Sequence, residues 1–277
     1  MAIKHFLSVV AMAAITLCSS AQDRETYVFD GSFTPKQHGT DASTGLNFWV
    51  KSVDPFEAVI MGSQVLTITG RTNADATVPD NAYTAFAPAA YSGAINLNVG
   101  LVLDDMGYTP VGIGYGAFAN CTGVTSVQLP RYLTTVSRGA FYGCTGLTEV
   151  TQFRFPVKRP GSLHWCTFFP DVFRGCSSLI KADISIADFI WDGIFSGCHA
   201  LREVTITTSG NQLNAFRGHS TGALQTIRCL GENPGQYTDT SIFSEDEYAA
   251  IDVIVPAGTL AAYKAHPVWG LFENLHE

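Results

Sequence analysis

The stretch that decides the fold is GAFYGCTGLTEV, residues 139–150, read together with its close echo GAFANCTGVTSV at residues 116–127. The two copies lie 23 positions apart. Self-similarity at such a period is typical of solenoid proteins, in which each repeat forms one turn, or rung, of a coil. A single rung cannot bury its apolar side alone, so the repetition indicates that successive rungs stack on one another.

The repeat continues along the chain. Its phenylalanines are separated by 23, 32, 22 and 21 residues, and three residues after each stands a cysteine, except in the fifth copy, where His219 takes that place. This spacing predicts a narrow interior in which equivalent side chains stack in ladders. The repeated residues are Phe118, Phe141, Phe173, Phe195 and Phe216, followed by Cys121, Cys144, Cys176, Cys198 and His219.

An apolar triplet at i, i+3 and i+5 follows each phenylalanine, as at Leu201, Val204 and Ile206. Its last two members are two residues apart, so both point inward from one short strand while their neighbours face solvent. Weaker triplets, Ala94-Leu97-Val99 and Ala250-Val253-Val255, flank the series. Together they predict a coil of about seven rungs with a parallel sheet along one side.

The motif G-A-F-x-x-C-T-x-L-T-x-V, preceded by Val-Gly-Ile-Gly at 111–114, resembles the BspA-like leucine-rich repeats of bacterial secreted and surface proteins. Residues 253–269 resemble the terminal cap of such chains, and residues 91–93 resemble their usual lead-in. The resemblance covers about residues 91–277. It implies a β-rich leucine-rich-repeat solenoid and adhesion to host or bacterial surface components.

The first 21 residues have the pattern of a cleavable signal peptide: a basic start, an apolar run of about a dozen residues and small residues before Gln22. Lipidation at Cys18 is the alternative, although a lipobox requires a small residue where Leu17 stands. The protein is therefore expected to be secreted or held at the cell surface. The predicted parts are 1–21 signal peptide, 22–90 N-terminal β cap with strands at 48–50, 58–61 and 65–68, 91–249 solenoid, and 250–277 last rung with a short helical cap.

Composition excludes several functions. Without residues 1–21 the chain carries 15 Lys and Arg against 24 Asp and Glu, a net charge of −9, which disfavours nucleic-acid partners. Beyond the signal peptide, no stretch reaches the roughly 18 apolar residues that a membrane-spanning helix requires. Six cysteines remain, and because stacked side chains lie alongside one another, their orientation favours thiols over disulfides. Cys166, outside the ladder, is the one interpreted as reactive or paired.

We find no pattern for catalysis or for a cofactor. A straight ladder of Cys176, Cys198 and His219 cannot converge on one zinc ion, and none of the nucleophile, zinc-protease or phosphate-loop motifs is present. The adjacent carboxylates at 104–105 and 245–247 are interpreted as solvated loop residues. We therefore expect a non-catalytic protein with no metal and no cofactor.

Two groups of residues are candidates for binding. Residues between Phe141 and Phe173 form an insertion rich in aromatic and basic side chains, which either contacts a partner or merely packs an enlarged turn. The second group consists of polar residues that face outward from the predicted strands. The candidates are Phe155, Lys158, Arg159, His164 and Trp165 in the insertion, and Gln128, Glu149, Lys181, Glu203 and Arg228 on the strands.

The sequence thus favours a protein that binds an extracellular protein or glycan through an extended surface. The alternative is a structural component of the cell envelope without a dissociable ligand. A structural component is expected to self-associate, whereas a recognition surface is expected to stay free of contacts with other copies.

Overall fold

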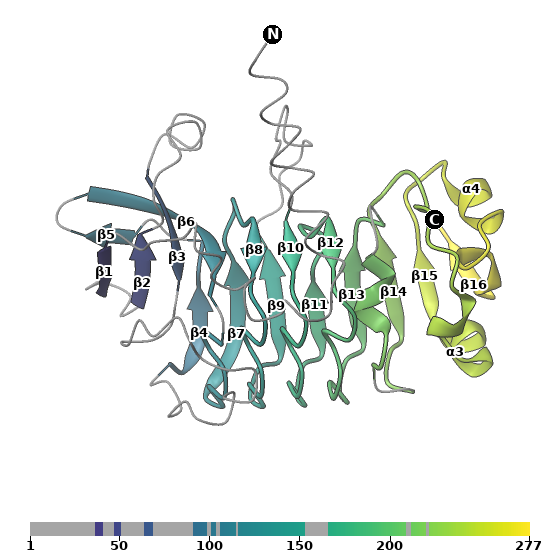
Figure 1. The fold of residues 1–277 in the computed structure, drawn as a ribbon. Coiled ribbons are helices and arrows are strands. Elements are labelled where there is room, and N and C mark those ends of the chain that lie inside the picture. Colours follow the sequence, from purple (N-terminus) through teal and green to yellow (C-terminus); the bar gives the residue numbers. More distant parts are fainter. Residues whose placement is uncertain are drawn as a thin grey trace, which may run out of the picture.

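A computed structural model describes residues 37–40, 47–50, 64–68, 91–98, 101–103, 106–114, 116–152, 166–208, 212–219 and 222–277. Their strands form two sheets that run along an elongated coil (Figure 1). In the repeats up to β13, the chain passes from a strand of one sheet, through the turn that holds the repeated phenylalanine, into a strand of the other. The predicted β-rich leucine-rich-repeat solenoid is confirmed.

Sheet B has eight described strands, which are all parallel. Neighbouring strands pair the predicted inward residues with one another, Val127 with Val150, and Ala182 with Val204. In spatial order the strands are β4 (Gly93–Asn96), β7 (Val124–Leu129), β9 (Glu149–Gln152), β11 (Lys181–Asp183), β13 (Glu203–Ile206), β14 (Thr226–Cys229), β15 (Asp252–Ile254) and β16 (Asn274–His276).

Two details of sheet B differ from the expected rungs. In the first rung Ile95 pairs with Val127, so Leu97 takes the level of Leu129 and the triplet read as Ala94-Leu97-Val99 is shifted by two residues. A bulge between Gly93 and Ala94 adds one residue of this shift, and a rule based on sequence spacing does not predict a bulge. At the other end β16 adds a strand that the sequence analysis did not predict.

Sheet A was not predicted as a second sheet. Its strands in the repeats are only two residues long, too short to leave an alternating pattern. They are continued towards the N-terminus by longer strands, of which β3 pairs in parallel with β6. The strands are β1 (Gln37–Thr40), β2 (Asn47–Val50), β3 (Gln64–Ile68), β6 (Met106–Ile113), β8 (Thr135–Val136), β10 (Thr167–Phe168) and β12 (Phe189–Ile190), with β5 (Leu101–Leu103) antiparallel to β6.

The N-terminal strands β2 and β3 lie where the sequence analysis placed strands at 48–50 and 65–68, and β1, β2 and β3 form an antiparallel meander. The third predicted strand, at 58–61, lies outside the described residues, as do the signal peptide and Cys18. That 22–90 acts as a cap stays a prediction.

Short helices follow the last repeats. The predicted helix near residues 261–266 is α4 (Leu260–Lys264); its Tyr263 is fully buried, and so is Trp269 just after it. Within the described residues, no helix combines the length and the apolarity that crossing a membrane requires. The other helices are η2 (Gln212–Phe216), η3 (Thr240–Ile242), α3 (Glu245–Ala250) and η4 (Trp269–Leu271).

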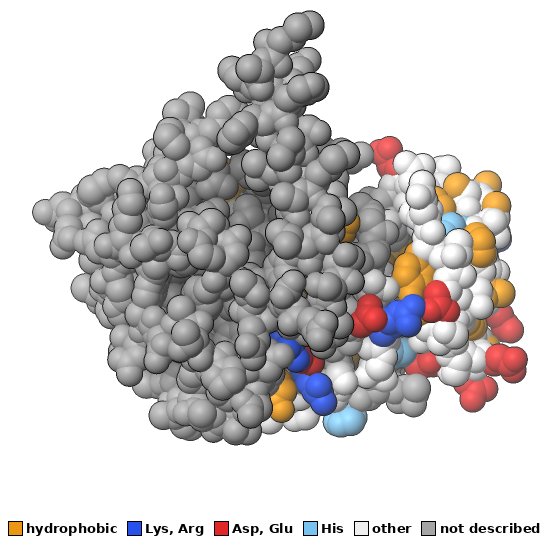
Figure 2. All heavy atoms as spheres, in the orientation of Figure 1, with side chains coloured by type: hydrophobic (Ala, Val, Ile, Leu, Met, Phe, Trp, Pro, Cys, Tyr) orange, Lys and Arg blue, Asp and Glu red, His pale blue; other side chains and the backbone are white. Residues whose placement is uncertain are grey.

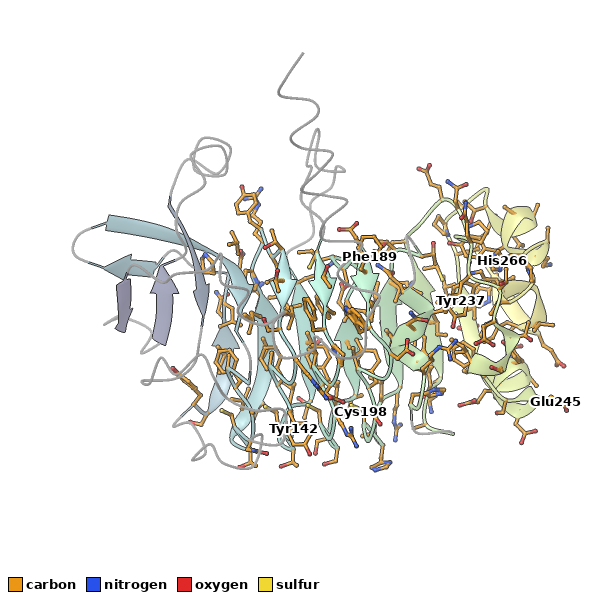
Figure 3. The ribbon with its side chains drawn as sticks, in the orientation of Figure 1. Tyr142, Phe189, Cys198, Tyr237, Glu245 and His266 are labelled. Atoms are coloured by element: carbon orange, nitrogen blue, oxygen red, sulfur yellow. The ribbon has the colours of Figure 1, made fainter. Side chains whose placement is uncertain are left out.

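The interior of the coil is a row of stacked aromatic rings (Figure 3). The centroids of Phe118 and Phe141 lie 5.2 Å apart with planes 4° from parallel, and those of Phe141 and Phe173 lie 5.5 Å apart at 14°. Phe195 continues the row at 5.8 Å, and all four rings are 0% exposed. The phenylalanine ladder predicted from the spacing is therefore confirmed.

The cysteines form a second ladder beside the rings. The thiol of Cys144 donates to the carbonyl oxygen of Phe118 at 3.0 Å, and Cys176 and Cys198 repeat the contact on Phe141 and Phe173, each at 3.1 Å. Each thiol thus satisfies a backbone acceptor of the preceding rung. All six described cysteines are thiols rather than disulfides, as their orientation favoured. Cys166 is 1% exposed, so the expectation that it is reactive is wrong.

We expect these thiols to be inert in the folded protein. Burial raises the pKa of the Cys198 thiol to about 12 and also raises that of Cys176, so neither forms the reactive thiolate near neutral pH. An aromatic disulfide reagent at pH 8 should label them only after denaturant is added. Rapid labelling of the native protein would contradict the ladder; a surface cysteine introduced at Ser177 provides the positive control.

The turns between the sheets are stacked by hydrogen bonds of their own. In one turn Phe141 N donates to Val172 O at 2.9 Å, and Gly143 N donates to Arg174 O at 2.8 Å. Gly143 has a φ of 67°, a left-handed conformation that glycine adopts without strain. Asp171 has a φ of 60° without being a glycine, and its carboxylate is held by Arg138 at 3.1 Å and by Arg174 at 3.2 Å.

Candidate interaction face

The candidate face is the outer surface of sheet B, which carries the side chains that alternate with the buried ones on strands β7 to β15. Parallel pairing places equivalent residues of successive strands side by side, so outward residues form two rows across the sheet. The pairing determines which residues are neighbours. One row runs Ser126, Glu149, Lys181, Glu203, Thr226, Asp252, and the other runs Gln128, Thr151, Asp183, Thr205, Arg228, Ile254.

Five predicted binding residues lie in these rows, and all five are partly exposed. Glu149, Lys181 and Glu203 are consecutive members of the first row, whereas Gln128 and Arg228 belong to the second. The structure therefore brings three of the predicted residues together and keeps the other two at a distance from one another. Their role in binding stays a prediction.

Lys181 and Glu203 form an ion pair across two strands, with 3.1 Å between Nζ and Oε1. Their side chains are 44% and 30% exposed. An ion pair at such exposure contributes at most about 1 kcal/mol, because water screens it. Both groups can therefore exchange their mutual contact for contacts with a partner at little cost.

Two residues expected to face solvent do not reach it. Asp183 is 6% exposed and Thr205 is 1% exposed, although both lie in the outward row between Thr151 and Arg228. The carboxylate of Asp183 accepts hydrogen bonds from the backbone N–H of Ser185 at 3.1 Å and from its hydroxyl at 2.7 Å. The middle of the second row is thus closed to a partner, which leaves the first row as the more accessible one.

Residues 108–221 match the model of the BspA type leucine rich repeat region in six copies. This part of the chain is a BspA-type leucine-rich repeat region. It holds Glu149, Lys181 and Glu203, whereas Arg228 lies just beyond it.

Three solved structures are similar to the chain. A leucine rich cell surface protein from Faecalibacterium prausnitzii is 19% identical with a TM-score of 0.42, over 82% of this chain and 45% of that one. The leucine-rich repeat protein of T. pallidum is 16% identical, with a TM-score of 0.39, and the match covers 69% of this chain and 84% of that one. A leucine-rich repeat protein from Bacteroides ovatus is 12% identical, with a TM-score of 0.22, and the match covers 83% of this chain and 66% of that one. The chain thus spans less than half of the Faecalibacterium protein. A search of curated proteins finds no significant relative.

Sheet B extends past the matched repeat region through β15 and β16. Asp252 lies next to Thr226 in the first row, and its carboxylate is 3.2 Å from Nδ1 of His276. Both side chains are about half exposed. No sequence pattern predicts this pair, because β16 follows no repeat and no triplet marks it as a strand.

The other half of the predicted site, Phe155, Lys158, Arg159, His164 and Trp165, lies outside the described residues. These residues belong to the segment between β9 and β10 of the repeat region. Whether they bind or pack stays a prediction.

A charged cluster lies at the C-terminal side of the repeat region, where Figure 2 shows basic and acidic side chains side by side on the described surface. Arg217 donates to the hydroxyl of Tyr237 at 3.0 Å and also pairs with Asp239 and Asp192. Hydrogen bonds from Ser241 and the charge of Arg217 lower the pKa of Asp239. These groups satisfy one another, so the cluster holds neighbouring rungs together rather than presenting a base or an acid.

The sequence suggested that the carboxylates at 245–247 are solvated loop residues. The structure shows that this is wrong for one of them and that they do not lie in a loop. They form the first turn of α3, where Glu247 is 6% exposed and makes a capping box with Ser244. Its Oε1 lies 2.8 Å from Nε2 of His219, the residue that replaces cysteine in the fifth copy. The pair at 104–105 lies outside the described residues.

Proposed function

We propose that the protein is an exported, non-catalytic repeat protein that binds an extracellular protein or glycan through the outer face of sheet B. The observation that supports this proposal most directly is the row of partly exposed polar side chains, Glu149, Lys181 and Glu203, held in register on consecutive strands. Side chains fixed to a stacked sheet lose little entropy when they bind, which favours recognition by such a surface.

The size of the face also supports binding. Eight strands spaced at about 4.8 Å extend over roughly 34 Å. That length is sufficient for an interface of about 800 Å² on each partner. The charges alternate in sign along the first row, with Lys181 between Glu149 and Glu203. A partner of alternating charge or one rich in hydroxyl groups suits this pattern better than a uniformly charged polymer.

The insertion provides a second, independent part of the proposal. Its aromatic and basic residues suit a contact surface, because Trp and Arg contribute large contact areas at interfaces. We include Trp165 and Arg159 in the proposed binding surface on that ground.

Reversal of charge at Lys181 tests the proposed face. Lys181→Glu places a third carboxylate between Glu149 and Glu203, so an array of extracellular-matrix proteins and glycans should show at least about tenfold weaker binding of any ligand that the wild type retains. Lys264→Glu, an equal charge change on the exposed side of α4, should leave binding unchanged. Arg228→Ala and Trp165→Ala then show whether the second row and the insertion take part.

Equal binding by the wild type and Lys181→Glu would remove sheet B from the site. Loss of binding only with Trp165→Ala would move the site to the insertion. A chain that binds nothing on the array but forms concentration-dependent oligomers in size-exclusion chromatography would favour the structural alternative.

A further inference from the structure

The fifth rung replaces the ladder cysteine with His219, and the replacement creates a buried pair. His219 Nδ1 contacts the carbonyl oxygen of Phe216, and Nε2 lies 2.8 Å from Oε1 of Glu247. The two side chains are 6% and 7% exposed. A buried imidazole and a buried carboxylate so close together differ from the solvent-exposed pair of His276 and Asp252.

Both nitrogens of His219 face oxygen atoms that accept hydrogen bonds. The carbonyl of Phe216 has no proton to give, and the Glu247 carboxylate already accepts the backbone N–H of Ser244 at 2.9 Å and its hydroxyl at 3.0 Å through Oε2. A neutral imidazole has only one N–H, so one of its nitrogens would point a lone pair at an oxygen lone pair. Both contacts are satisfied only when both nitrogens carry a proton.

The side chain of His219 is surrounded by residues of η2, of the segment between η3 and α3, and of α3. The ring of Phe216 from η2 lies at 6.0 Å and that of Phe243, between η3 and α3, at 5.6 Å, both edge to face. The charged and titratable groups on these elements or next to them are Arg217, which pairs with Asp192 and Asp239, together with Tyr237, Tyr248, and the exposed Glu245 and Asp246 of α3. Among the described residues, Glu247 is the charged group in direct contact with the imidazole.

We propose that His219 and Glu247 form a protonation-dependent latch, in which a doubly protonated imidazole and a carboxylate hold helix α3 against the end of the repeats. Helix α3 leads directly into β15, whose Asp252 belongs to the outer face of sheet B. The latch therefore couples the pH of the surroundings to the attachment of the last strands of that face.

The sign of the pH dependence follows from the two partners. Loss of the second imidazole proton, which a rise in pH favours, would turn one of the two contacts into a repulsion between lone pairs and so lower the stability. On the acid side, burial raises the pKa of Glu247, but hydrogen bonds from Ser244 and His219 outweigh it and lower the pKa below its ordinary value. The carboxylate's contribution is therefore present above its ordinary pKa and is lost as the pH falls through the lowered one.

Thermal unfolding of the full chain between pH 5.5 and 8.5 tests the latch, with wild type compared with His219→Gln and with His219→Cys, which restores the ladder residue. At pH 6 the wild type should unfold at least about 3 °C above His219→Gln. The difference should fall by at least half at pH 8.5. The quantity compared is the difference in unfolding temperature between wild type and variant. The contribution of His266, whose pKa is lowered by burial, is the same in both proteins and cancels.

Two control variants separate the latch from other histidines. His199→Gln removes an exposed imidazole next to Cys198, and His276→Gln removes the half-exposed pair with Asp252; both should lie within about 1 °C of the wild type at every pH. A difference between wild type and His219→Gln that stays constant from pH 5.5 to 8.5 would overturn the proposal, because purely steric packing does not titrate.

A measurement on the wild type keeps the proposal testable if the variants do not fold. The nitrogen-15 chemical shifts of the His219 imidazole distinguish one N–H from two. At pH 6 we expect both nitrogens to be protonated. A singly protonated ring at that pH would contradict the latch.

Discussion

Replacement of Phe141 by alanine is expected to lower the free energy of unfolding by about 3 to 5 kcal/mol. The ring is 0% exposed and lies between two parallel rings, with centroids 5.2 and 5.5 Å away. Because both neighbours belong to other rungs, the deleted ring leaves a cavity that cannot close unless whole rungs move. The loss should therefore lie near the upper end of the range.

Urea unfolding followed by far-ultraviolet circular dichroism measures this effect. Phe141→Leu keeps most of the volume and should cost clearly less than alanine. Ile180→Ala serves as the surface control, since that side chain is 47% exposed, and should cost under about 1 kcal/mol. If Phe141→Ala and Ile180→Ala have equal effects, the stacked row does not stabilise the coil in the way described.

Substitution of Gly146 by alanine is expected to cost about 2 to 3 kcal/mol, because no space exists for a methyl group. A Cβ atom there would lie 2.2 Å from the carbonyl oxygen of Thr122 and 3.2 Å from that of Val124. Both oxygens are backbone atoms of the preceding rung, so relief of the clash requires separation of two rungs that are also joined by the β7–β9 ladder.

The repeat provides a matched control for this substitution. The equivalent position, two residues after the ladder cysteine, holds Ser178 and Ala200 in later rungs. Ala200→Gly should therefore cost only the roughly 1 kcal/mol or less that added backbone freedom brings. Denaturant midpoints of Gly146→Ala and Ala200→Gly that shift by the same amount would show that the close approach at Gly146 is not a real constraint.

The sequence predicted the coil because each rung repeats the same contact. The spacing from phenylalanine to cysteine is the same at Phe118, Phe141, Phe173 and Phe195. Because stacking requires that spacing, the regular pattern in the sequence predicts the ladder in the structure. The same logic failed at Ala94, where the register differs from the expected one by two residues, one of which a bulge adds. It also failed for sheet A, because a strand of two residues is too short to show an alternating pattern of apolar and polar residues.

The site was less predictable than the fold for a different reason. Alternation along a strand correctly placed Glu149, Lys181 and Glu203 on the outer face, but it assigns every second residue to solvent and cannot tell that Asp183 and Thr205 are covered. The contact between His219 and Glu247 joins residues 28 positions apart in different elements. The missing cysteine at His219 was visible as an irregularity, but nothing in the sequence indicated its partner.

The thiol contacts have a consequence for how this protein changes in length. Cys144, Cys176 and Cys198 each donate to the phenylalanine carbonyl of the rung before, so the groups that join two rungs are the same at three successive junctions. A tandem duplication of one unit, 22 residues in the case of Phe173 to Phe195, would insert a new rung between junctions that remain chemically unchanged. The length of the outer surface can therefore change by whole repeats during evolution, while the packing of the interior stays the same.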